Sequence, residues 1–222
     1  MNNALYLVST PIGNLKDITL RALEVLEKVS LIACEDTRTT RILLNHYNLT
    51  NKTTSYNDIN KTRKTSQIIK HIIEQGDVAL VSDAGTPSIS DPGVYLVREA
   101  IKNNISVIPI PGPSSILAAL TASGSATDTF LFCGFLPRKK NKKKNKLQQL
   151  LNYDITVIIF ESPQRIIDTL EVIKSLDQNR NLFMGREITK YYEEFLQGTA
   201  GFLIDHFKTK PKGEIVLIIK DK

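Results

Sequence analysis

The sequence predicts an α/β protein with a mainly parallel sheet, and two patterns lead to this class. Short apolar runs typical of strands alternate with segments whose apolar residues recur at helical spacing. Loops rich in glycine, proline and short polar residues follow the apolar runs, as expected where parallel strands lead into helices. With 222 residues and 41% hydrophobic residues, the chain is long and apolar enough to bury a core in one large or two small domains.

The first half alternates regularly between the two kinds of element. Strands are predicted at residues 4–9, 31–34, 78–82 and 106–110, because these are short apolar runs that stop at turn signals. Apolar residues at 20, 23, 26 and 29 predict a helix over 18–29, with Asp17 or Thr19 as its N-cap. Further helices are expected from about residue 38 to 47, over 64–75 before the C′ glycine Gly76, over 94–102, and from 114 to 122.

The second half contains a different mixture of elements. Strands are predicted at residues 129–136, 156–160, 182–185 and 215–219. Helices are predicted at 146–151, from Pro163 to about 176, and at 202–207, with Pro163 suited to a first helical turn. Small residues dominate 112–125, which suggests a domain boundary there. We therefore expect an N-terminal α/β domain over residues 1–112 and a C-terminal α/β domain over 113–222.

The net charge of +6 is concentrated in one short segment. Seven of the nine residues from 138 to 146 are basic: Arg138, Lys139, Lys140, Lys142, Lys143, Lys144 and Lys146. Without them the chain has 22 basic and 23 acidic residues. Such a local excess predicts contact with a polyanion, although a solvated, mobile loop would have the same composition.

Several function classes have no support in the sequence. The dinucleotide motif G-x-G-x-x-G, the P-loop motif and G-x-S-x-G are all absent. The three histidines and two cysteines lack metal-ligand spacing, so we expect no metal site and no disulfide framework. No run of 18 apolar residues occurs and the first residues do not resemble a secretory signal, so we expect a cytoplasmic protein without a membrane partner.

Four loops follow the predicted strands of the first half, at residues 10–14, 35–38, 83–93 and 111–115. In parallel α/β sheets, ligands bind beyond the carboxyl ends of the strands. The loop at 83–93 is the most informative, because its small residues permit close approach of a ligand and Asp83 and Asp91 offer acceptors. A turn-rich connection with helix caps would account for the same composition.

Eight short strings, in order, resemble one family along nearly the whole chain. They are STPIGNL (9–15) with DIT (17–19), EDTR (35–38), SDAGTP (82–87) with SDPG (90–93), PGPS (111–114), GFLP (134–137), ESP (161–163) with Arg165, REITK (186–190) and KGE (212–214). The chain resembles the ribosomal RNA small subunit methyltransferase I family. That family methylates the ribose 2′-hydroxyl of a cytidine in 16S rRNA and belongs to the tetrapyrrole methylase-like, class III S-adenosylmethionine methyltransferases.

The resemblance implies the two-domain tetrapyrrole methylase-like fold, with a mainly parallel N-terminal sheet and a mixed C-terminal sheet. It also implies S-adenosyl-L-methionine in the interdomain cleft, 16S rRNA of the small subunit as partner, and a homodimer. The cofactor-binding residues carried over are Asp83, Ala84, Gly85, Thr86, Pro87, Ser114, Ser115, Phe160, Glu161, Ser162 and Glu187. The acceptor loop is expected at Thr10, Pro11, Gly13 and Asn14, and RNA binding at the basic residues of 138–146.

The reaction is a displacement in which a ribose oxygen attacks a methyl carbon, so alignment of the two supplies much of the catalysis. A base for the hydroxyl proton would add to it. The candidates for that base remain open: Glu35, Asp36, Asp83, Glu161 and Glu187. Arg38, Arg186 and Lys190 are expected to hold phosphates or hydroxyls, and we place Glu35, Asp36, Arg38 and Lys190 in the catalytic set.

Two other functions fit the same residues less well. One is a class III methylase acting on a tetrapyrrole or a protein residue, for which a lysine-rich segment has little use. The other is a noncatalytic RNA-binding factor of ribosome assembly that has kept the fold.

Overall fold

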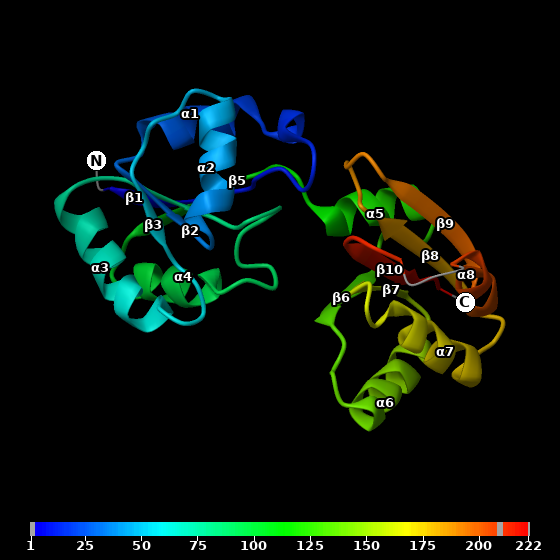
Figure 1. Cartoon of the computed structure of the whole chain (residues 1–222). Helices are drawn as coiled ribbons and strands as arrows, with labels where there is room; N and C mark the ends of the chain where they lie inside the picture. Colours follow the sequence, from blue (N-terminus) through cyan, green and yellow to red (C-terminus); the bar gives the residue numbers. More distant parts are fainter. Residues whose placement is uncertain (1–2, 208–210, 222) are drawn as a thin grey trace. The chain divides into compact units, whose positions relative to one another are not determined.

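The computed structural model describes residues 3–207 and 211–221 and divides the chain into two compact units. The first comprises Met1–Ser114 and the second Ser115–Lys222. Figure 1 shows that each unit has its own sheet with helices packed beside it.

The first unit contains a five-stranded sheet with the order β3-β2-β4-β1-β5, in which every neighbouring pair is parallel. The strands are β1 (Ala4–Val8), β2 (Leu31–Cys34), β3 (Thr53–Ser55), β4 (Val78–Val81) and β5 (Ser106–Ile110). The helices are the short 3₁₀ helix η1 (Leu15–Asp17), α1 (Leu20–Lys28), α2 (Thr37–His46), α3 (Lys61–Glu74) and α4 (Gly93–Lys102). Since parallel strands end at one edge, the loops that follow them share that edge.

Both faces of this sheet are buried, as the side chains of β4 show. Val78 and Leu80 pack into an apolar cluster with α3 and α4. Ala79 and Val81 point the other way, into a cluster with α1 and α2. A continuous apolar strand is what a parallel sheet covered on two sides requires.

The second unit contains a mixed five-stranded sheet with the order β6-β7-β10-β8-β9. Only β6 and β7 pair in parallel, and the other neighbours are antiparallel. The strands are β6 (Phe130–Phe135), β7 (Thr156–Glu161), β8 (Asn181–Arg186), β9 (Glu194–Thr199) and β10 (Ile215–Ile219). The helices are α5 (Ser115–Ser123), α6 (Lys140–Leu151), α7 (Ile166–Leu176) and α8 (Ala200–His206). The core packs α6, α7 and α8 against β7, β8 and β10.

The predicted α/β class, with a parallel first sheet and a mixed second sheet, is confirmed. Two strands differ from the prediction, which has no strand at either place. Residues 53–55 are polar and lie at a sheet edge, whereas residues 194–199 contain a charged residue and a glycine, so neither segment has a clear strand pattern. At the start of α1, Thr19 rather than Asp17 accepts the capping hydrogen bond, from the backbone N–H of Ala22.

The basic segment differs most from expectation, because it is helical. Helix α6 begins at Lys140, six residues before the predicted start at 146. Its buried residues are Lys143, Leu147, Leu150 and Leu151, at positions i, i+4, i+7 and i+8. This spacing places them on one helical face, with Lys143 supplying its aliphatic stem in place of a leucine. The sequence hides this pattern because a lysine occupies the first apolar position.

Replacing Leu147 tests whether the basic segment is anchored as a helix. Leu147 is fully buried in the core of the second unit, so Leu147→Ala is expected to lower the free energy of unfolding by about 2–5 kcal/mol. The exposed neighbour Gln148→Ala is the control and should change it by less than about 0.5 kcal/mol. Urea unfolding followed by circular dichroism measures both, and equal midpoints would contradict the packing of α6.

Candidate functional site

Backbone hydrogen bonds join two of the predicted loops in the first unit. The N–H of Thr10 donates to the carbonyl of Gly85 at 2.9 Å, and the N–H of Gly85 donates to the carbonyl of Thr10 at 3.0 Å. The Thr10 hydroxyl also donates to the carbonyl of Ser82 at 3.2 Å. Gly85 has a φ of 79°, a conformation that side chains with a Cβ rarely adopt. The loop after β1 and the loop after β4 are thus one paired structure.

The loop after β5 joins them through Thr86. The hydroxyl of Ser9 donates to that of Thr86 at 3.3 Å, and the Thr86 hydroxyl donates to the carbonyl of Pro113 at 3.3 Å. At Gly112 a Cβ would lie 2.9 Å from the Cβ of Ser9, so this close approach requires glycine. Three of the four expected loops therefore converge around Thr86.

A cavity of ≈ 120 Å³ opens beside this junction. Its lining comes from the loop after β1, the side of α2 that carries Thr39 and Leu43, and Ser82 and Asp83 at the end of β4. Thr10 and Pro11 of the expected acceptor loop line it. Gly13 is exposed and Asn14 caps η1 by accepting a hydrogen bond from the N–H of Lys16, so this end of the loop is organised by local structure.

The four neighbouring acidic side chains are in different electrostatic states. Asp36 is the N-cap of α2 and accepts hydrogen bonds from the guanidinium and the N–H of Arg38, which hold its pKa at about 2. Burial raises the pKa of Glu35, of Asp83 and of Asp91, and repulsion from neighbouring carboxylates, Asp36 in the case of Asp83, adds to the effect. For Asp91 the pKa reaches about 6. Negative charge is therefore incompletely compensated at the ends of β2 and β4.

Asp91 is not among the bases expected from the sequence, although it lies in the loop at 83–93. Ser88 and Ser90 in the same loop have φ values of 71° and 64°. Non-glycine residues in this region are uncommon and concentrate where surrounding structure imposes a conformation, often at functional sites. The SDPG string at 90–93 is the signal that could have identified it. Of the donor residues expected here, Asp83 and Ala84 are exposed while Gly85 and Pro87 are buried.

In the second unit, Glu161 is fully engaged in internal contacts. Its carboxylate accepts hydrogen bonds from the Thr169 hydroxyl at 2.7 Å and from the N–H of Ser162 at 2.9 Å, and lies 3.3 Å from Nε of Arg165. Lys143 donates to the Thr169 hydroxyl at 3.2 Å. Glu161 thus orders the turn after β7, which carries Ser162, and its side chain is inaccessible to a ligand.

The hydrogen bond from Lys143 to Thr169 shows that one lysine of the basic segment points into the protein. Lys143 is 6% exposed and burial lowers its pKa, so it is not a surface cation and its assignment to RNA binding is corrected. The remaining six basic residues differ from it in exposure. Arg138, Lys139, Lys140, Lys142 and Lys144 are exposed, and Lys146 is half-buried.

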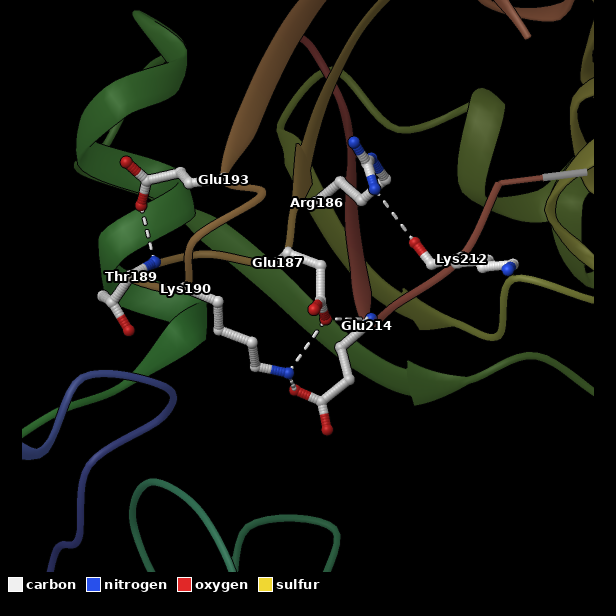
Figure 2. A network of polar contacts seen from close by, with 7 residues as sticks. All are labelled: Arg186, Glu187, Thr189, Lys190, Glu193, Lys212 and Glu214. Atoms are coloured by element: carbon white, nitrogen blue, oxygen red, sulfur yellow. Dashed lines mark hydrogen bonds and ion pairs between the residues drawn. The ribbon is translucent and has the colours of Figure 1, made fainter. Parts of the chain in front are cut away.

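Figure 2 shows a second polar cluster, in which Lys190 is held between two carboxylates. Its Nζ lies 2.9 Å from Oε1 of Glu187 and 2.9 Å from Oε2 of Glu214. Glu187 Oε1 also accepts the N–H of Glu214, and the N–H of Thr189 donates to Glu193. The cluster joins the turn after β8 to the segment that enters β10.

The backbone of this cluster is unusual. Glu187 and Thr189 have φ values of 50° and 68°. At Gly213, with a φ of 91°, a Cβ would overlap the side chain of Glu187. Burial opposes the charge on Lys190, but the hydrogen bonds to Glu187 and Glu214 outweigh it and raise the Lys190 pKa. Lys190 is therefore a fixed cation, and the structure adds Glu214 and Gly213 to the residues expected around it.

The remaining expected residues lie at the ends of elements. Ser114 closes the first unit and Ser115 begins α5. Phe160 packs its ring 4.9 Å from that of Phe132, between centroids. Across the described ranges 3–207 and 211–221, no group of three or more histidine, cysteine or acidic residues is placed to hold a metal ion. Within those ranges, no helix has the length and apolar character needed to cross a bilayer.

The fold resembles that of several solved methyltransferases. Cobalt precorrin-4 methyltransferase superposes with a TM-score of 0.72 at 16% identity, over 97% of this chain and 94% of its own. A diphthine synthase gives 0.73 at 13% identity, over 99% and 90%. Uroporphyrin-III C-methyl transferase from Thermus thermophilus, in complex with S-adenosyl homocysteine, gives 0.68 at 15%, over 97% and 96%. At these identities the similarity establishes the fold.

Sequence comparison establishes the family. Residues 4–203 match the model of the Tetrapyrrole (Corrin/Porphyrin) Methylases. Proteins named Ribosomal RNA small subunit methyltransferase I match over nearly the whole chain. The relative from Mesorhizobium japonicum is 49% identical over 97% of this chain and 74% of its own, and that from Thermotoga maritima is 43% identical over 98% of both. The resemblance seen in the sequence is thereby confirmed: the chain belongs to the tetrapyrrole methylase family and, within it, to the ribosomal RNA small subunit methyltransferase I family.

Proposed function

We propose that this protein transfers a methyl group from S-adenosyl-L-methionine to the ribose 2′-hydroxyl of a cytidine in 16S rRNA of the small ribosomal subunit. As a member of its family the chain is a methyltransferase that uses this donor. The proposal of an RNA substrate rests on 43–49% identity, over nearly the full chain, to proteins named Ribosomal RNA small subunit methyltransferase I. We further propose that it acts as a homodimer in the cytoplasm.

The donor fits the electrostatics of the first unit. When bound, S-adenosyl-L-methionine supplies an electrophilic methyl group on a positively charged sulfonium. Glu35, Asp83 and Asp91 have raised pKa values because their charges are partly buried and poorly compensated. A cation beside them would relieve that repulsion. We propose that residues 83–87 and Ser114 of the first unit hold the donor. In the second unit, Glu161 orders the turn at Ser162.

The candidate bases differ in burial and in pKa, and these differences show which of them could accept a proton. Asp36 is held ionised by Arg38, Glu161 is buried, and hydrogen bonds from Lys190 and the N–H of Glu214 outweigh burial to lower the pKa of Glu187. A base that accepts the hydroxyl proton needs a higher pKa and access to the acceptor. Glu35 and Asp83, with Asp91 added, meet the first requirement. Lys190 is ion-paired with both Glu187 and Glu214, so its charge is compensated and it is proposed as a donor to a hydroxyl rather than as a phosphate site.

The direct test is transfer of labelled methyl to purified small ribosomal subunits from a strain lacking this gene. Nuclease digestion and mass spectrometry should place the label on a cytidine as 2′-O-methylcytidine. Transfer to a free tetrapyrrole and none to subunits would contradict the proposal.

A substitution at Gly85 tests whether the loop at residues 83–87 binds the donor. Gly85→Ala forces a Cβ into a φ of 79° and within 3.3 Å of Ile12, so the pairing with Thr10 is strained and donor affinity should fall about tenfold or more. Gly124→Ala is the matched control, since Gly124 has a φ of 62° but nothing within 4 Å of the place that a Cβ would occupy. Both variants should lose about 1 kcal/mol of stability. Calorimetric titration measures donor binding, and equal affinities for the two variants would argue against this loop.

The pH dependence of donor binding tests the carboxylates. Since burial raises the Asp91 pKa to about 6, the group is mostly neutral at pH 5 and ionised at pH 7. Affinity for the cationic S-adenosyl-L-methionine should therefore rise up to about tenfold from pH 5 to 7 and then level off. The neutral product S-adenosyl homocysteine should show a smaller change, and Asp91→Asn should flatten the profile. Parallel profiles for the two ligands would contradict an electrostatic role.

Substituting exposed and buried lysines of α6 distinguishes contacts with RNA phosphates from contacts inside the protein. Lys142→Gln with Lys144→Gln should reduce the slope of log affinity for RNA against log salt by up to about 2, because each phosphate contact releases counterions. Lys143→Met should leave that slope unchanged, since its ammonium binds Thr169 inside the protein. Filter binding to 16S rRNA between about 50 and 200 mM salt measures both, and a slope that depends on Lys143 alone would refute this assignment.

A further inference from the structure

One large aromatic side chain of the second unit faces solvent at the end of a strand. Phe135 is 59% exposed, although the next residue, Leu136, is buried in the core. Gly134 has a φ of 61°, and the pairing of β6 with β7 shifts register between Phe132 and Phe135. An irregularity of this kind can re-aim a side chain, and the Phe135 side chain at this point is exposed.

The backbone around Phe135 is held firmly. Nη2 of Arg165 donates to the carbonyl of Leu136 at 2.8 Å and to that of Pro137 at 3.2 Å. Nε of Arg165 lies 3.3 Å from Glu161, whose side chain is completely buried. The Phe135 ring also contacts that of Phe160, with centroids 5.5 Å apart. The exposed ring is therefore fixed in place, and little conformational entropy would be lost if a ligand packed on it.

The exposed cations begin three residues further on. Figure 1 shows that a short loop leads from β6 into α6. Arg138 and Lys139 lie in that loop, and Lys140, Lys142 and Lys144 follow on α6, all exposed. No acidic residue occurs from 134 to 153. Phe135 and Arg138 are separated by at most about 10 Å of chain, a separation that one nucleotide spans between its base and a neighbouring phosphate.

Proteins that bind single-stranded RNA combine these two features, aromatic rings on which bases stack and cations that follow the phosphates. We propose that Phe135 is a stacking platform for an unpaired nucleobase of the RNA, whose flanking phosphates bind Arg138, Lys139 and α6. The inference rests on the proposed function and adds a base contact to a surface otherwise assigned only to phosphate. It makes Phe135 a determinant of preference for unpaired over duplex RNA.

Charge favours RNA as the occupant rather than a second copy of the chain. A symmetric contact of two copies through Phe135 would bring two strongly basic segments together without acidic partners. A polyanion instead neutralises them. The exposed aromatic ring and the cations thus both fit single-stranded RNA as the ligand.

The absence of tryptophan from the chain provides a direct probe. Phe135→Trp introduces a single tryptophan at the proposed contact, and the probes are an oligocytidylate of about 12 nucleotides and an RNA duplex of about 12 base pairs, each long enough to cover a typical binding site. On binding the oligocytidylate, stacking should quench the tryptophan fluorescence, whereas the duplex should quench it much less. Phe135→Ala should weaken oligocytidylate binding on the order of tenfold, with the salt slope unchanged.

The control is Phe130→Ala, at the opposite end of β6, where the side chain is 38% exposed. It should bind both RNAs as the unaltered protein does. Oligocytidylate binding without quenching of the introduced tryptophan, or equal affinities for Phe135→Ala and Phe130→Ala, would overturn the proposal. Quenching that follows protein concentration without RNA, together with dimer dissociation by Phe135→Ala in sedimentation, would overturn it in favour of a contact with a second copy.

Failure of the proposed function is distinguishable from failure of this inference. If the unaltered protein transfers no methyl to small subunits, the proposed reaction is wrong whatever the fluorescence shows. If the unaltered protein binds the donor and transfers methyl but the oligocytidylate does not quench the tryptophan of Phe135→Trp, the reaction stands and the stacking contact is wrong.

Discussion

The first unit depends on the parallel arrangement of its five strands, which brings the loops that follow them to one edge. Mutual backbone hydrogen bonds between Thr10 and Gly85 then connect two of those loops, and Thr86 connects the third through Ser9 and Pro113. Gly85 has a positive φ and Gly112 lies against Ser9, so both positions favour glycine. The N–H of Asp36 donates to Oδ1 of Asp83 at 3.0 Å, which brings the loops after β2 and β4 together. Burial and repulsion among the carboxylates there make this edge suited to a cation.

In the second unit, the role of each charged side chain depends on how deeply it is buried. Glu161 and Lys143 interact through the hydroxyl of Thr169 and are removed from solvent, so they stabilise β7, α7 and α6 as one block. Lys190 is partly buried between Glu187 and Glu214, which fixes its position and keeps it charged. Most of the other lysines of α6 remain in water. Residues of the same type thus have structural, positioning and binding roles according to their surroundings.

Helix α6 combines two faces with separate purposes. The face that carries Leu147 and Leu150 is buried in the core, and the opposite face presents cations to solvent. Because the helix is packed along its length, those cations have defined spacing, as a mobile loop would not. The loop that leads into it is anchored by Arg165, so the exposed Phe135 has a fixed place at the start of the same surface.

The sequence by itself predicted the α/β class, most strands, a set of loops at the strand ends and the family, because apolar periodicity and the short strings report local geometry directly. It did not reveal β3 or β9, since short edge strands with polar residues or glycine lack a periodic signal. Only the tertiary structure showed that Lys143 is internal, that Glu161 is inaccessible and that the carboxyl groups near β2 and β4 have unequal pKa values. Burial and hydrogen-bond partners decide those properties, and both arise from residues distant in the chain.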